Sequence, residues 1–255
     1  MKTQIAAILL FAVFAANNAF AEQPVKKAHI VFLITKDTNN YEAHLTVPVF
    51  AEKLRKEHGY DVTVLLGEGE HGSYRYPSVE ALSTADLLIV FARRIAPPND
   101  QMKAIKDYIN SGKPVVGIRT ANHAFKVMGP IENGHEDWFE FVADVLGCEN
   151  KGYGPHDDGY DPYILPEAAN HPVVKNVQPT KWHSSGGLYL VELLDKEANV
   201  LMQGKHKDNV QPVAWTRTAS TNNKVFYISL GHPTDFALPQ FNAILVNGIK
   251  WALGK

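Results

Sequence analysis

The 255-residue sequence has almost no cysteine, because Cys148 is the only one. A single thiol cannot form an internal disulfide, so the fold must be stabilised by packing. Cys148 follows an apolar pattern in "DVLGCEN". That context favours a small buried residue over a catalytic thiol.

The sequence also has no large excess of one charge. Its 25 basic and 27 acidic residues give a formal net charge of -2. This balance provides no electrostatic basis for binding nucleic acid or an anionic membrane. The sequence therefore favours a neutral small-molecule ligand.

Long apolar runs are missing after the first residues, which have the pattern of a secretory signal. Lys2 gives a basic start, residues 5–16 are apolar, and Ala19-Phe20-Ala21 is typical of a signal-peptidase site. We therefore expect a signal peptide over residues 1–21, export to the periplasm or the extracellular space, and no membrane insertion of the mature chain. An uncleaved N-terminal anchor is the alternative.

The first half of the mature chain alternates short apolar runs with amphipathic segments. Alternation of this kind predicts a parallel sheet covered by helices on both faces. The predicted strands are residues 28–35, 60–66, 85–92 and 113–118, and the predicted helices are residues 46–59 and 98–112.

The second half has a different pattern of apolar runs and turn residues. An apolar face and a capping-box spacing predict a helix over residues 136–147, and a last helix is expected over residues 238–254. Between them, turn signals separate strand-like runs, which indicate antiparallel additions and one more central strand. These runs are residues 187–194, 199–204, 211–218 and 224–231. No linker divides the chain, so residues 22–255 are expected to form one domain.

Polar residues collect where the predicted parallel strands end. Ligands of open α/β sheets bind at the carboxyl ends of the strands. The candidates at these positions are Asp37, Tyr41, His44, Arg93, Arg119, Asn122, His123, His232 and Asp235. His232, with Asp235 close enough to orient it, is typical of acid/base chemistry, and His123 is its expected partner. Turn formation and helix initiation explain Asp37 and His44 equally well.

The middle of the chain supplies further candidates in His156, Ser185 and Tyr189. Aromatic rings mixed with polar groups suit polyhydroxylated ligands, although such loops are also ordinary turn material. No metal-binding spacing appears, so no cofactor is predicted, and a metal site would need distant histidines such as His44, His123 and His232.

Three segments resemble the ThuA-like family, which is named for trehalose utilisation. They are "VVGIRTANHAF", "PVAWTRT" and "KVFYISLGHPTDF" with the helix after it. The resemblance implies a class I glutamine amidotransferase-like, flavodoxin-like fold and a role with sugars. Glutamine amidotransferases of that fold carry a cysteine at the tight turn where this sequence has Arg119, so glutaminase chemistry is not expected.

The leading hypothesis is a carbohydrate-active protein that performs hydrolysis, elimination or isomerisation on a sugar, disaccharide or oxidised (keto) sugar. His232 and His123 would transfer protons, while Arg119 and Arg93 would hold a carbonyl or oxyanion. The alternatives are a non-catalytic sugar-binding protein and, with less support, a metal-dependent hydrolase.

Overall fold

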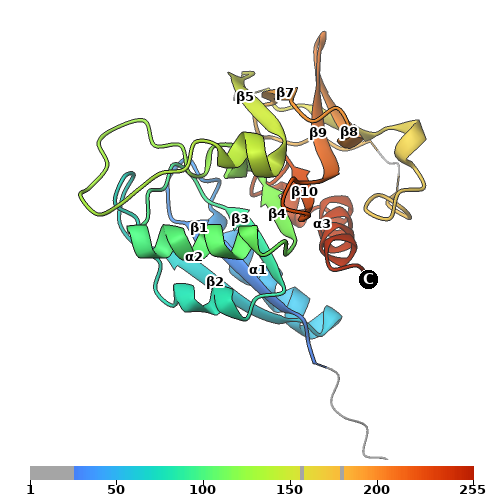
Figure 1. Ribbon diagram of the computed structural model, residues 1–255. Coiled ribbons are helices and arrows are strands. Elements are labelled where there is room, and N and C mark those ends of the chain that lie inside the picture. Colours follow the sequence, from blue (N-terminus) through green and yellow to red (C-terminus); the bar gives the residue numbers. More distant parts are fainter. Residues whose placement is uncertain (1–25, 156–157, 179–180) are drawn as a thin grey trace, which may run out of the picture.

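One mostly parallel sheet organises the protein. The computed structural model describes residues 26–155, 158–178 and 181–255, and the expected signal peptide and His156 lie outside them. In this described part, eight strands follow the order β2-β1-β3-β4-β10-β9-β8-β6 (Figure 1). The first five strands run parallel, and β9, β8 and β6 continue the sheet antiparallel. The predicted flavodoxin-like fold is therefore confirmed.

The strand bounds explain which residues reach the same edge of the sheet. The parallel strands are β1 (His29–Thr35), β2 (Asp61–Gly67), β3 (Leu87–Phe91), β4 (Val115–Ile118) and β10 (Lys224–Ile228). The antiparallel strands are β6 (Asp161–Ile164), β8 (Asn199–His206) and β9 (Asn209–Thr218). β3 and β4 are fully buried, whereas β2 is only partly buried because it is an edge strand.

Helices cover both faces of the sheet, as their apolar stripes predict. α1 (Ala43–His58) and α3 (Pro239–Ala252) pack on one face with Phe32, and α2 (Asn99–Asn110) packs on the other with Leu33. α1 begins three residues before the predicted start, because the turn from Asn40 to Ala43 opens it. It ends as predicted at Gly59, which adopts a left-handed φ of 68°.

The helix predicted over residues 136–147 is wrong for most of its length. Only Val142–Leu146 is helical, as a single π turn. The apolar periodicity comes from Trp138 and Phe141, which pack with Phe125 in an aromatic cluster instead of along a regular helix. Aromatic burial has therefore outweighed local helix propensity here.

A second, smaller sheet pairs two segments that are far apart in the sequence. β5 (Cys148–Tyr153) and β7 (Tyr189–Leu193) are antiparallel, with a bulge between Asn150 and Gly152. β5 also contacts the short 3₁₀ helix Arg119–His123 that follows β4. The small sheet therefore lies beside the carboxyl ends of the central strands (Figure 1). No helix in the described residues has the length and apolar character needed to cross a bilayer.

Candidate functional site at the carboxyl ends of the parallel strands

The turn after β4 has the backbone geometry of an elbow. Arg119 adopts a left-handed φ of 44°, which is costly for a residue with a Cβ. Gly117 allows the close packing behind this turn, since a Cβ there would lie 2.9 Å from Cδ2 of Tyr227. The Tyr227 hydroxyl donates to the Arg119 carbonyl oxygen at 2.7 Å and holds the turn in place.

The Arg119 side chain is fully buried and contacts protein groups. Nη1 donates to the Ser229 carbonyl oxygen at 2.7 Å, and Nη2 donates to that of Gly187 at 3.2 Å. The guanidinium carbon lies 4.0 Å from the ring centroid of Tyr41 and 4.7 Å from that of Tyr189. The expectation that Arg119 holds a substrate carbonyl is therefore corrected: its guanidinium joins the loops to each other, because neighbouring carbonyl groups and aromatic rings surround it.

The charge on Arg119 is retained despite its burial. Burial alone would lower the pKa of Arg119, but nearby Tyr189 and Tyr41 outweigh it, and the pKa lies above its usual value. Burial in turn raises the pKa of Tyr189 well above its usual value. The guanidinium of Arg119 therefore contacts the rings of both Tyr41 and Tyr189.

His123 lies at the end of the same 3₁₀ helix and is only 3% exposed. Its Nδ1 lies 2.5 Å from Oδ1 of Asn122, and because a carbonyl oxygen only accepts, this contact favours the tautomer with the proton on Nδ1 and the lone pair on Nε2. Burial, followed by the charges of Arg94 and Arg93, holds the pKa of His123 well below its usual range. His123 is therefore a neutral imidazole at physiological pH.

His232 is oriented by Thr234 and not by Asp235, which corrects the expected pairing. The His232 Nδ1 lies 2.8 Å from the Thr234 hydroxyl. Asp235 Oδ2 instead accepts from the backbone N–H groups of Gly231 at 2.8 Å and His232 at 2.9 Å, and from the Ser184 hydroxyl at 3.0 Å. The carboxylate has this role because the turn after β10 points backbone donors inward. Burial lowers the pKa of His232, and Asp235 opposes the shift.

A cavity of about 430 Å³ opens between the loops that follow the central strands and the small sheet. This volume lies in the range of roughly 300 to 1,000 Å³ that small-molecule sites occupy. The cavity is lined by Thr38, Asn39, Tyr41, Arg93, Arg94, His123, Tyr153 and Tyr189. The lining does not include Arg119 or His232, and His232 instead contacts the ring of Tyr41 at a centroid distance of 6.0 Å.

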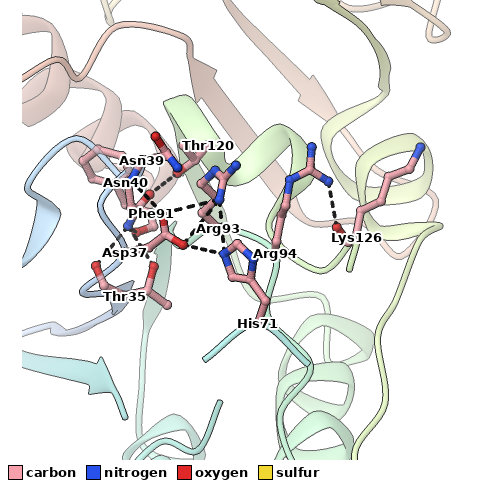
Figure 2. A network of polar contacts seen from close by, with 10 residues as sticks. All are labelled: Thr35, Asp37, Asn39, Asn40, His71, Phe91, Arg93, Arg94, Thr120 and Lys126. Carbon is pink, nitrogen blue, oxygen red and sulfur yellow. Dashed lines mark hydrogen bonds and ion pairs between the residues drawn. The ribbon is translucent and has the colours of Figure 1, made fainter. Parts of the chain in front are cut away.

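Asp37 and His71 hold Arg93 at the edge of this cavity (Figure 2). Nη1 of Arg93 lies 3.3 Å from Oδ2 of Asp37 and 3.1 Å from Nε2 of His71, and the same nitrogen of His71 also contacts Oδ2 of Asp37. Sequence reasoning missed His71. The available signal was its position in the loop after β2, which ends at the same edge as the other parallel strands.

Other predicted residues lie around the cavity without lining it. Asn122 is buried beside His123, and Ser185 contacts Thr234 at 3.2 Å in the loop of His232. His44 lies in the first turn of α1. Among the described residues, no three His, Cys, Asp or Glu side chains gather closely enough to hold a metal ion, and so His44, His123 and His232 form no such group.

Two contributors were not anticipated as site residues. Tyr153 lines the cavity and packs edge-on to Tyr189 at 5.1 Å, which depends on the pairing of β5 with β7. Asn40 is buried and joins β1, β3 and the 3₁₀ helix through Thr35, Phe91 and Thr120 (Figure 2). Asn40 thus sets the spacing of three of the loops that form the site.

The mostly parallel sheet and the elbow after β4 place the protein in the glutamine amidotransferase-like class of α/β folds. The family model for ThuA, described as trehalose utilisation, matches residues 30–252. The chain belongs to the ThuA family, and this membership indicates a carbohydrate-related function. The comparison with curated proteins gave no significant match.

Solved structures with the same fold include two ThuA-like proteins. One, from Parabacteroides merdae, has a TM-score of 0.66 and 18% identity, over 90% of this chain and 91% of its own. The other, from Bacteroides uniformis, has a TM-score of 0.61 and 19% identity, over 91% of this chain and 95% of its own. At these identities the similarity supports the fold alone.

Proposed function

We propose that the protein binds a sugar, a disaccharide or an oxidised (keto) sugar in the cavity at the carboxyl ends of the strands. The observation that carries the proposal is the lining itself, which combines the rings of Tyr41, Tyr153 and Tyr189 with the polar groups of Arg93 and His123. Aromatic faces pack against the apolar faces of sugar rings, and polar groups bind the hydroxyls. Membership of the ThuA family supports the same ligand class.

We further propose that His123 acts as a general base on the bound sugar. The Nδ1 proton is held by Asn122, which leaves the Nε2 lone pair to accept a proton. In an oxidised sugar, the carbon next to the carbonyl group carries an acidic proton. Removal of that proton by Nε2 would start an elimination or isomerisation, and a guanidinium of the lining would stabilise the negative oxygen. This assignment replaces His232 as the expected base, since His232 does not line the cavity.

Non-catalytic sugar binding is the second candidate. Its supporting observation is the elbow after β4, where a buried arginine stands in place of a nucleophile. The buried thiol of Cys148 does not supply one, because burial raises its pKa to about 12. A cavity with aromatic walls and no nucleophile is sufficient for binding without turnover.

A sugar screen with His123 variants tests both candidates. A ligand at a hundredfold excess over its Kd stabilises the folded state by about 2.7 kcal/mol, so thermal shifts identify binders with or without turnover. Products are then sought by mass spectrometry. If His123 is the base, His123→Gln lowers turnover at least 100-fold and keeps the thermal shift, while the surface variant His183→Ala changes neither. Stabilisation without any product supports binding alone. No stabilisation by any sugar contradicts the proposal.

Export is proposed from the sequence. The apolar run and the small residues at Ala19 and Ala21 favour cleavage before Glu22. N-terminal sequencing of the protein recovered outside the cytoplasm should begin at Glu22. A chain that keeps Met1 and stays in the cytoplasm contradicts export.

A further inference from the structure

The cavity lining has a strong local charge, although the whole chain is nearly neutral. Arg93 and Arg94 both line the cavity, and no carboxylate is among the described lining residues. Asp37, next to the cavity, offsets one of the two positive charges by pairing with Arg93. One guanidinium charge therefore has no carboxylate partner among the described residues of this region.

Arg93 is held in position and still has donors to offer. Its side chain is 18% exposed, and the paired Asp37 is 10% exposed. The contacts of Arg93 with Asp37 and His71 all use Nη1. Among the described residues, Nη2 and Nε make no contact with a protein acceptor, so they remain for a ligand. A pre-positioned guanidinium loses little side-chain entropy on binding.

Arg94 is fixed by a different set of contacts. Its backbone has a left-handed φ of 51°, and its N–H donates to the His123 carbonyl oxygen at 3.3 Å. Nη1 donates to the Lys126 carbonyl oxygen at 3.1 Å, which orients the guanidinium (Figure 2). No carboxylate pairs with Arg94 among the described residues. The strained backbone is maintained where it places a second arginine in the cavity lining.

The same two guanidinium charges act on His123. After burial, Arg94 and Arg93 are the largest causes of its lowered pKa, which means that the cavity disfavours a further positive charge. The same two charges favour a negative one. A neutral sugar would gain no charge-charge attraction from these arginines, whereas an anion bound in the cavity would pair with a guanidinium.

We infer that the preferred ligand is an acidic sugar, an aldonate or a uronate, whose carboxylate binds Arg93 and Arg94 while its carbon skeleton packs against the tyrosines. The inference rests on the proposed function and specifies its ligand. Guanidinium groups match carboxylates in geometry. A monoanion is favoured over a phosphate dianion because the two lining guanidinium charges and the Asp37 carboxylate leave one positive charge. This conclusion replaces the neutral ligand suggested by the net charge of the sequence.

Isothermal titration calorimetry at low salt tests the inference, with glucuronate, gluconate, glucose and glucose 6-phosphate as probes. We expect an acid to bind at least tenfold more tightly than glucose. Arg93→Gln and Arg94→Gln should each weaken acid binding by tenfold or more, and each should weaken acid binding by a larger factor than glucose binding. The matched variant Arg75→Gln removes an exposed arginine that does not line the cavity, and it should change neither affinity.

The outcomes separate the inference from the proposed function. Equal affinity for acids and glucose overturns the acidic-sugar inference and leaves sugar binding intact. Tighter binding of glucose 6-phosphate than of either acid overturns the carboxylate assignment. No binding of any probe overturns the inference, and the sugar screen described above then decides the proposed function separately. Because Arg93 also holds Asp37, urea unfolding of each variant checks its fold, and Arg94→Gln tests the inference without disturbing that pair.

Discussion

Arg119 and Gly186 are matched to one another. A Cβ on Gly186 would lie 2.2 Å from Nη2 of Arg119 and 2.5 Å from its Cζ. An arginine head usually moves aside, but this one is held by the carbonyl groups of Ser229 and Gly187. The pair therefore acts as a single packing unit in which neither residue can be changed alone.

Gly186→Ala should lower the free energy of unfolding by about 1 to 3 kcal/mol, the usual cost of overpacking. Urea denaturation measures the change. The control is Gly129→Ala, because a Cβ there meets nothing within 4 Å. It should stay within about 0.5 kcal/mol of the parent protein. Equal stability of the two variants would show that Arg119 can move and is not fixed as described.

Protonation of His123 should couple stability to pH. Its pKa is lowered in the folded state, so the unfolded chain binds more protons below about pH 6.5. The free energy of unfolding should therefore fall as the pH drops from about 6.5 towards the folded-state pKa, by up to about 1.4 kcal/mol per pH unit from this group.

Urea unfolding of the parent protein and of His123→Gln between pH 5 and pH 8 measures this effect. The variant should show a shallower loss of stability below about pH 6.5, since one titrating group is removed. The difference at pH 8, where His123 is neutral in both states, gives the packing cost alone. Parallel profiles for the two proteins would contradict a buried neutral His123.

The turn between β10 and α3 depends on Asp235. Its Oδ2 accepts from Gly231, His232 and Ser184, so the carboxylate joins this turn to the segment before β7. Asp235→Ala should lower the free energy of unfolding by about 2 kcal/mol or more, because buried donors lose their acceptor. Asp235→Asn keeps an oxygen there and should cost less.

Amide hydrogen exchange at Gly231 and His232 distinguishes this role from catalysis. Faster exchange at both amides in Asp235→Ala is expected, because the acceptor that protects them is lost. Unchanged exchange together with lost turnover would assign Asp235 to the chemistry instead.

The apolar patterns of the sequence differed in how well they predicted helices and strands. Residues 238–254 were predicted as a helix and α3 confirms it, because one apolar stripe repeats throughout. The same kind of stripe over residues 136–147 gave a wrong helix, since Trp138 and Phe141 are buried in an aromatic cluster. β5 was missed because its residues alternate weakly and it depends on pairing with β7.

The whole molecule has two hydrophobic layers on either side of one sheet. Cys148 lies in one layer and is fully buried. Its thiol should react with a disulfide reagent at pH 8 only when that layer opens, because burial raises the thiol pKa to about 12.

Labelling of Cys148 during a urea titration should follow the unfolding curve measured by tryptophan fluorescence. The expected result is coincident transitions with no labelling of the native protein. Rapid native labelling would contradict a closed layer around β5.

Some of the predicted site residues line the cavity and others do not. Arg93, His123 and Tyr41 line the cavity because each follows a parallel strand, and the alternating pattern predicted the parallel strands but not their order. The sequence did not show to which side each side chain points. The burial of Arg119 against the ring of Tyr41 was therefore not predicted.

The sequence by itself determined the alternating α/β pattern, the edge of the sheet where polar residues gather, and the resemblance to the ThuA family. Local periodicity and residue type are sufficient for these, because each depends on a few neighbouring positions. Only the tertiary structure decided that Arg93 and Arg94 face the cavity while Arg119 is buried beneath it. That choice depends on β5 and β7 pairing across the site, and such long-range contacts are not encoded in any local pattern.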